Sequence, residues 1–187
     1  MPPPSVECTP DEGAGNTSTR RHPRLRKAPP GLPWSMEKHP LHTVITRSRN
    51  GALAGVAATA VMSAVMGLAK AGGLMERQPP PIIVESFFPE WDEPTRNAAA
   101  VLSHFGYGAG SGAVYGLVCA PKNRNARTGA LYGALVWAAG YEGWLPLLNI
   151  LPPAHHDGRG RAITMFTAHI IYGSVLGMAS RPKKPQQ

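Results

Sequence analysis

Three ionisable side chains stand inside otherwise uncharged stretches of this 187-residue sequence: His104, Glu142 and His169. Such groups are costly in an apolar environment, so they usually face a cavity or one another. Tyr107 and Tyr172 each follow a histidine by three residues, which places each tyrosine on the same face of a helix as its histidine. We therefore treat these five residues as one candidate polar cluster.

Three interpretations of the cluster remain open. In the first, hydrogen bonds among its members fix the register of packed helices. In the second, the cluster responds to acid, because histidine titrates at about pH 6.5 and a carboxylate partner such as Glu142 stabilises its charged form. In the third, His104 and His169 hold a haem or a metal ion between two helices, for which two histidines at equal depth are the minimal requirement.

Elsewhere the sequence has no arrangement typical of catalysis. The Ser and Thr residues of the uncharged stretches lack a histidine and an acid at a recognisable spacing, and no phosphate-binding loop is found. The glycine-rich run at residues 108–113 has neither the preceding strand nor the acidic residue that dinucleotide binding requires. Cys8 and Cys119 are too far apart for a metal-binding motif. The leading expectation is a non-enzymatic protein without a cofactor or a metal site.

Four uncharged stretches predict the elements that position the cluster. A helix needs roughly 20 residues to cross about 30 Å of hydrocarbon, and each stretch is close to that length. They predict an all-α, polytopic membrane protein with spans at residues 51–69, 98–120, 128–148 and 162–180, of which the third contains Glu142. His104 and His169 would each lie roughly 10 Å inside the membrane, counted from the same side. A soluble helical bundle is the alternative.

The connecting segments carry charge unevenly. Residues 1–49, residues 121–127 and the segment after residue 180 hold 14 of the 19 Lys and Arg residues, whereas residues 70–97 and 142–161 hold five of them with seven of the 11 acids. Basic segments stay on the cytoplasmic side of a membrane. We therefore expect both termini in the cytoplasm and the cluster in the outer leaflet of the membrane.

The first 49 residues form a basic, Pro-rich arm, and residues 182–187 form a short cytoplasmic tail. The arm has too few apolar residues to offset its ordering entropy, so we expect it to be disordered. Its basic residues precede the first span, where they would contact anionic lipid headgroups. Aromatic residues do not interleave with them, which argues against nucleic acid as a partner. The expected partner is the lipid bilayer.

Two sequence words occur twice. Residues 51–55 and 129–133 read GALAG and GALYG, and residues 104–108 and 169–173 read HFGYG and HIIYG. Their order predicts two helical hairpins inserted in the same orientation, which is a parallel repeat. Glycines four residues apart let a second backbone approach closely, either within the chain or in a homo-oligomer. The glycines expected at such contacts are Gly51, Gly55, Gly108, Gly112, Gly116, Gly129, Gly133, Gly173 and Gly177.

These words resemble the YagU-like family of small bacterial inner-membrane proteins. The resemblance covers about residues 50–180 and rests on the run at 51–59, the prolines at 79–81, the words at 104–108 and 115–116, and the run EGWLP at 142–146. The family is largely uncharacterised, with a suggested link to acid resistance. The resemblance therefore implies a membrane protein of acid or envelope stress and supplies no catalytic residue. The alternatives are a small proton, ion or solute transporter or channel that acts as a homo-oligomer, and a haem-binding redox protein.

Overall fold

The computed structural model describes residues 40–181. The tail at residues 182–187 and most of the arm lie outside the described residues, so the expected disorder of the arm and its lipid contacts stay predictions. The end of the arm differs from expectation because it is helical. Helix α1 spans Pro40–Ala71 and begins well before the first uncharged stretch. Residues 41–50 contain neither Gly nor Pro, and Pro40 occupies the first helical position, where its missing N–H is not needed.

Helices form all the regular structure of residues 40–181, which confirms the all-α prediction. After α1, the helical segments in chain order are α2 (Pro79–Phe87), α3 (Glu93–Val118), η1 (Pro121–Asn123), α4 (Ala126–Trp137), η2 (Ala138–Trp144), α5 (Leu145–Leu147) and α6 (Arg159–Ala179). Side chains fix where two of them begin. Asp92 accepts a hydrogen bond from the backbone N–H of Thr95 (3.4 Å), and Asn125 accepts one from that of Thr128 (3.1 Å).

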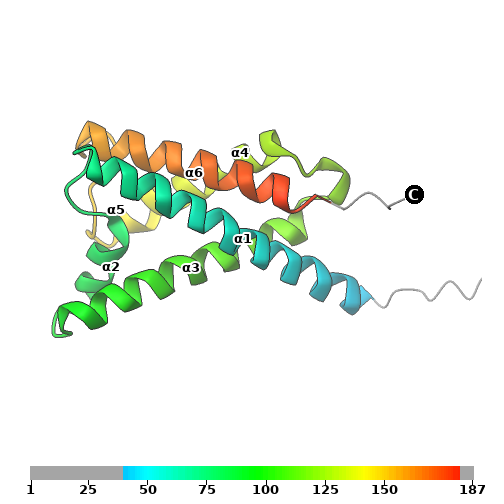
Figure 1. Ribbon diagram of the computed structural model, residues 1–187, viewed down its shortest axis with the longest axis horizontal. Helices are drawn as coiled ribbons and strands as arrows, with labels where there is room; N and C mark the ends of the chain where they lie inside the picture. Colours follow the sequence, from blue (N-terminus) through cyan, green and yellow to red (C-terminus); the bar gives the residue numbers. More distant parts are fainter. Residues whose placement is uncertain (1–39, 182–187) are drawn as a thin grey trace, which may run out of the picture. The chain divides into compact units, whose positions relative to one another are not determined.

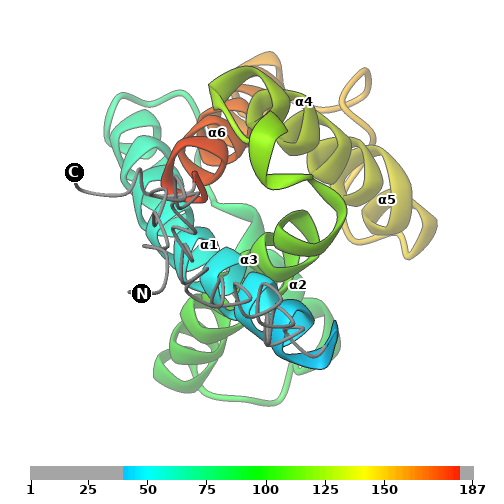
Figure 2. The same ribbon diagram turned by 90° about the vertical axis from the view of Figure 1, so that its right-hand side faces the viewer.

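The long helices form two pairs. Helix α1 packs along α3, α4 packs along α6, and the two pairs are joined where α1 lies against α6 (Figure 1). Viewed along the helices, the α1–α3 pair and the α4–α6 pair stand side by side (Figure 2). Within residues 40–181, the chain therefore runs as one hairpin, α1 to α3, followed by a second, α4 to α6.

Backbone contact at glycines holds the first pair together. A Cβ atom on Gly51 would collide with the carbonyl oxygen of Gly112, and one on Gly55 would collide with that of Gly108. A Cβ atom on Gly116 would in turn collide with the carbonyl oxygen of Arg47. The helices approach this closely because no side chain separates them.

The second pair repeats these contacts in the same order. A Cβ atom on Gly129 would collide with the carbonyl oxygen of Gly173, as one on Gly51 would with that of Gly112. A Cβ atom on Gly177 would collide with the carbonyl oxygen of Asn125. All nine glycines expected at helix contacts lie at contacts within the chain, namely Gly51, Gly55, Gly108, Gly112, Gly116, Gly129, Gly133, Gly173 and Gly177.

The contacts define which residues of the two hairpins correspond, and they correct the alignment of the second sequence word. Gly173 corresponds to Gly112, whereas the words HFGYG and HIIYG align Gly173 with Gly108. The difference is four residues, or about one helical turn. His104 and His169 are therefore not equivalent positions. His169 on α6 corresponds instead to Gly108 on α3. The carbonyl of His169 faces Gly133 on α4, just as the carbonyl of Gly108 faces Gly55 on α1.

The third predicted span is not one regular helix. Helix α4 ends at Trp137 and continues into η2, a wide π-helical segment in which the N–H of Leu145 bonds to the carbonyl of Gly140, five residues back. Pro146 explains the change, since in an α-helix its ring would clash with the carbonyl four residues earlier. The wider turn carries Tyr141 to a buried position that faces the other helices.

Two helices have the length and apolar composition to cross a membrane, α1 over Leu41–Ala71 and α6 over Arg159–Ala179. Gly, Ser and Tyr residues lower the mean hydropathy of α3, and α4 is short because η2 interrupts the segment. A buried helix of a soluble protein can share the length and composition of α1 and α6. The prediction of four spans therefore goes beyond this finding.

Candidate functional site

A cavity of about 200 Å³ lies between the two helix pairs. Residues of α1, α3, η2 and α6 line it, together with Val136 of α4, Leu145 of α5 and three residues of α2. The wall is mainly apolar, and it contains no Asp, Glu, Lys or Arg side chain. Its hydroxyl and imidazole groups come from Thr59, Ser103, His104, Tyr107, Tyr141, His169 and Tyr172.

Four of the five residues of the predicted cluster line this cavity. His104 and Tyr107 reach it from α3, and His169 and Tyr172 reach it from α6. The predicted spacing explains the result, because residues three apart on a helix share a face. The two helices belong to different hairpins, so the cavity lies where the hairpins meet.

Glu142 is not a member of the cluster. Its side chain is exposed, it is not among the residues of the cavity wall, and its Oε1 accepts a hydrogen bond from the backbone N–H of Ala154 (3.0 Å). The expectation assumed a regular helix through residue 142. The π-helical segment η2 changes the angle between successive side chains, so that Tyr141 faces the cavity and Glu142 faces the loop before α6.

The imidazole of His169 is held by its own helix. Its Nδ1 lies 2.7 Å from the carbonyl oxygen of Met165. A carbonyl can only accept, so Nδ1 carries the proton of the neutral ring and donates it. The Nε2 atom on the opposite edge is then an acceptor.

His104 has a different environment. Its Nε2 atom is buried and has no hydrogen-bonding partner among the described residues. A buried polar atom without a partner costs free energy, and in a native protein it often indicates a group that meets a ligand or water. Among the described wall residues, His104 is thus the one with a fully buried side-chain polar atom that has no hydrogen-bonding partner.

The two tyrosines of the cluster also differ in burial and in hydrogen bonding. The hydroxyl of Tyr172 is buried and donates a hydrogen bond to the carbonyl oxygen of Gly108 on α3 (2.8 Å). The side chain of Tyr107 is half exposed (51%) although it lines the cavity. Ser103, one turn earlier on α3, is also exposed and also lines the cavity. We place the mouth of the cavity at this face of α3.

Tyr141 is a residue of the wall that the predicted cluster did not include. Its ring lines the cavity, and its hydroxyl donates a hydrogen bond to Asp157 in the loop before α6. Asp157 also forms an ion pair with Arg161, and its own side chain is 1% exposed. The hydrogen bond from Tyr141 to Asp157 and the ion pair between Asp157 and Arg161 together connect the wall of the cavity to the first turn of α6. Pro146 is the signal in the sequence for an irregular turn here, but it does not indicate which side chain the turn directs into the cavity.

The charge of Asp157 is stabilised where it lies. Burial alone would raise the pKa of this carboxyl, but hydrogen bonds from Arg161, from Tyr141 and from the backbone N–H of Gly158 outweigh burial and hold its pKa below the usual range. Asp157 is therefore ionised at neutral pH. Its carboxylate accepts hydrogen bonds from Tyr141, Gly158 and Arg161 and so holds η2 against the start of α6.

Arg124 is a second residue that the sequence did not single out. It is 7% exposed, and its guanidinium donates to the carbonyl oxygens of Cys119 (3.1 Å), Ser180 (3.2 Å) and Gly116. These carbonyls lie at the C-terminal ends of α3 and α6, where carbonyl groups lack helical partners and the helix dipole is negative. A single arginine thus joins the two hairpins at the end remote from Asp157.

Comparisons with models of known protein families, with curated proteins and with solved structures found no match to this chain. The resemblance to YagU-like proteins accordingly stays a prediction. The arrangement defined by residues 40–181 is a duplicated helical hairpin with a neutral, mainly apolar cavity between its halves.

Proposed function

We propose that this chain is a non-enzymatic membrane protein with four spans whose two cavity histidines respond to acid. Both chain ends would lie in the cytoplasm, and the cavity would lie in the outer half of the membrane. The charges, the exposed apolar side chains and the wall of the cavity support different parts of this proposal.

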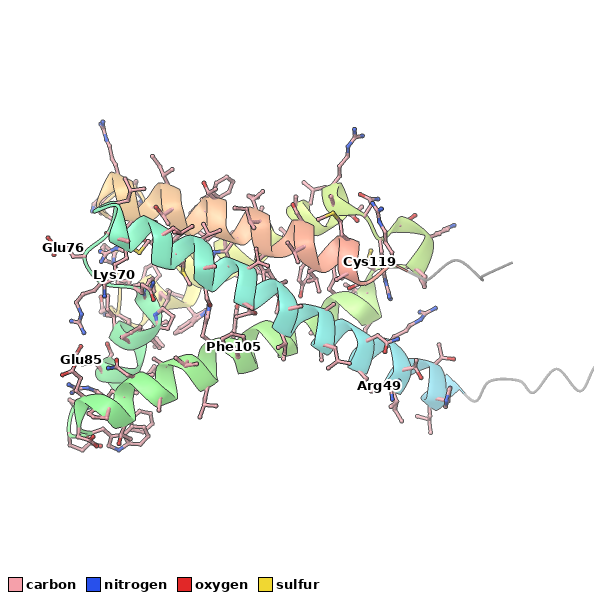
Figure 3. The ribbon with its side chains drawn as sticks, viewed as in Figure 1. Arg49, Lys70, Glu76, Glu85, Phe105 and Cys119 are labelled. Carbon is pink, nitrogen blue, oxygen red and sulfur yellow. The ribbon has the colours of Figure 1, made fainter. Side chains whose placement is uncertain are left out.

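The charged residues support the four spans and their orientation. At the end where α1 and α4 begin and α3 and α6 end, the described charges are basic: Arg47, Arg49, Lys122, Arg124, Arg127 and Arg181. The seven acids of residues 40–181 all belong to segments at the opposite end, with five basic residues. Figure 3 shows Lys70, Glu76 and Glu85 at one end and Arg49 toward the other. The basic end matches the cytoplasmic side of a membrane protein.

Exposed apolar side chains lie between these two charged ends. Leu53 on α1, Leu102 on α3, Leu131 on α4 and Ile163 on α6 are each more than half exposed. Water would penalise so many exposed apolar groups, whereas hydrocarbon accommodates them. Their presence on all four helices of the two pairs supports α3 and α4 as parts of spans beside α1 and α6. The bacterial inner membrane as the location follows from the YagU-like resemblance alone.

The single observation that carries the acid response is the composition of the cavity wall. His104 and His169 line a cavity that has no carboxylate in its wall. When either ring gains a proton, its positive charge has no counter-charge in the wall and little water around it. Acid would therefore favour a rearrangement that opens the cavity between the hairpins. This mechanism differs from the sequence expectation, in which Glu142 paired with the charged histidines.

Thermal unfolding in mild detergent at about pH 7.5 and about pH 5 tests the proposal, because these values lie on either side of the ordinary histidine pKa of about 6.5, which applies to the unfolded chain. We expect a lower midpoint at the acidic pH, and we expect the double variant His104→Asn, His169→Asn to lose most of this difference. The matched control is Glu142→Gln, which should keep the full difference because Glu142 does not line the cavity. An equal difference in the wild type and in the double histidine variant would overturn the proposal.

The two alternatives have weaker support. A proton pathway that depends on Glu142 would need this carboxylate near the histidines, and its hydrogen bond to Ala154 holds it at the loop instead. A haem between His104 and His169 would require more room than a cavity of about 200 Å³ supplies. The absorption spectrum of the same purified samples provides the test, since a haem would give a Soret band.

A further inference from the structure

The same cavity has the properties of a binding site. We propose that it binds a neutral phenolic ring that enters from the lipid phase, with the ring hydroxyl hydrogen-bonded to the Nε2 atom of His104. This inference goes beyond the acid response and does not depend on it. It uses the membrane placement proposed above only for the route of entry.

The volume sets the size of the occupant. An apolar cavity of about 150 Å³ is known to hold benzene, so about 200 Å³ accommodates one ring with a small substituent. A larger ring system would have to displace the helices. A water cluster is disfavoured because much of the wall consists of apolar groups such as Met62, Val136, Leu145 and Met165.

The wall also sets the charge of the occupant. It contains no Asp, Glu, Lys or Arg side chain, so a charged ligand would lose its hydration without gaining a counter-charge. Most of the ligand surface must be apolar for the same reason. Aromatic rings from Tyr107, Tyr141, Trp144 and Tyr172 supply faces and edges against which another ring can pack.

The hydrogen bonds of the wall indicate a hydroxyl group on that ring. The donors of Thr59, Ser103, Tyr141 and Tyr172 and the Nδ1–H of His169 already bond to other groups of the protein. The polar atoms of Tyr107 and Trp144 also have no hydrogen bond among the described residues, but they are not fully buried, whereas the Nε2 atom of His104 is buried without a partner. A hydroxyl can both donate and accept, so it can satisfy this atom in either tautomer of the imidazole.

The route of entry follows from the exposed part of the wall. Ser103 and Tyr107 line the cavity and are exposed on the face of α3, between the charged ends of the helices. In the proposed membrane placement this mouth opens to hydrocarbon. A ligand with an apolar substituent would therefore arrive from the bilayer and could leave that substituent outside.

Fluorine NMR of the full chain in detergent at about pH 7.5 tests the site with two probes, 4-fluorophenol and its methyl ether 4-fluoroanisole. The two molecules have similar rings, but only the phenol has a hydroxyl hydrogen. We expect saturable line broadening by the protein and a preference for the phenol of about five- to tenfold, which is the effect of one buried hydrogen bond. Empty micelles give the background of non-specific partition.

Two substitutions at the same position locate the hydrogen bond. His104→Leu should bring the preference for the phenol close to one, whereas His104→Gln places an amide nitrogen near the former Nε2 and should retain much of it. His155→Leu, in the exposed loop before α6, is the matched control and should leave the preference unchanged. Each variant is compared only if its elution and thermal midpoint at this pH match those of the wild type. Should His104→Leu affect folding, Val136→Trp provides a second test, because it fills the cavity and should abolish saturable binding of both probes.

Broadening that does not saturate, or that equals the broadening by empty micelles, would overturn the proposal. A preference for the phenol that persists in His104→Leu would also overturn it, because the hydroxyl would then bond elsewhere. The measurement is made at one pH above the histidine titration, so its failure would leave the acid response standing. Loss of the acid response would likewise leave phenol binding intact.

Discussion

The hydroxyl of Tyr172 on α6 donates a hydrogen bond to the carbonyl oxygen of Gly108 on α3, at 2.8 Å. The bond crosses from one hairpin to the other at the edge of the cavity, and the tyrosine is 2% exposed. The two words of the repeat thus meet in space, through the tyrosine of one and the last glycine of the other.

The substitution Tyr172→Phe should lower the free energy of unfolding by about 1 kcal/mol, because it removes one buried hydrogen bond and retains the ring. Thermal unfolding in detergent measures the change. Tyr107→Phe is the control, since the hydroxyl of Tyr107 has no hydrogen bond among the described residues and its side chain is half exposed. Equal effects of the two substitutions would contradict the importance of the bond between the hairpins.

Two glycines of α3 should respond in opposite ways to alanine. Gly112→Ala places a methyl group against the carbonyl oxygen of Gly51 and should destabilise the protein by about 1–3 kcal/mol. Gly110→Ala adds a methyl group to open space and should stabilise α3 by up to about 1 kcal/mol, the difference in helix propensity. Thermal midpoints of the two variants provide the comparison. A loss of stability in Gly110→Ala would instead indicate a contact on this exposed face, such as one in a homo-oligomer.

Asp157 should make stability depend on pH in the acidic range. Its pKa is lower in the folded protein than in the unfolded chain, so the stabilisation is complete above its ordinary value of about 3.9 and is lost as the pH falls through the lower, folded value. Asp157→Asn should therefore cost about 1–3 kcal/mol at neutral pH and flatten the dependence below about pH 4. Unfolding by denaturant at a series of pH values measures both effects. A loss of the same size at all pH values would mean that the charge of Asp157 is not the stabilising feature.

Replacing Arg124 should separate the ends of α3 and α6. Arg124→Gln leaves up to three carbonyl oxygens without their charged donor and should cost about 2 kcal/mol. Arg124→Lys should recover only part of this loss, because one ammonium group lacks the planar fork that reaches several acceptors. The nearby, exposed Lys122→Gln serves as the control and should change the thermal midpoint little. Equal midpoints for all three variants would contradict the role of Arg124.

The sequence predicted the helical class and the contacts of the glycines, because these depend on local composition and on spacing along one helix. It also predicted that His104, Tyr107, His169 and Tyr172 lie together, since the two residues of each pair share a helical face, and all four line one cavity. The alignment of the second word failed by one turn, because the contacting glycines, and not the letters, define the register.

Glu142 could not be placed from the sequence, because the turn at η2 depends on how Pro146 is accommodated in three dimensions. Arg124 was assigned only to a basic loop. The count of charges in that loop predicted its side of the membrane, but such a count cannot distinguish an exposed arginine from one that binds the ends of two helices.

The correspondence of the two hairpins has a consequence for the symmetry of their packing. An exact twofold repeat would make the seam between α1 and α6 equal to the seam between α4 and α3, yet only the first is closely packed. Ala54 and Ala58 on α1 correspond to Tyr132 and Val136 on α4, when counted from Gly51 and Gly129. The hydroxyl of Tyr132 bonds to the carbonyl of Ser111 on α3 (2.7 Å), so a bulky side chain bridges the second seam.

The two seams therefore differ because the two hairpins differ in sequence. Two identical hairpins would form either two equal seams, both closed, or two equal hollows. GALAG and GALYG differ in one letter, so a small residue (Ala54) stands in the first hairpin where a bulky, hydrogen-bonded one (Tyr132) stands in the second, and the two seams cannot pack alike.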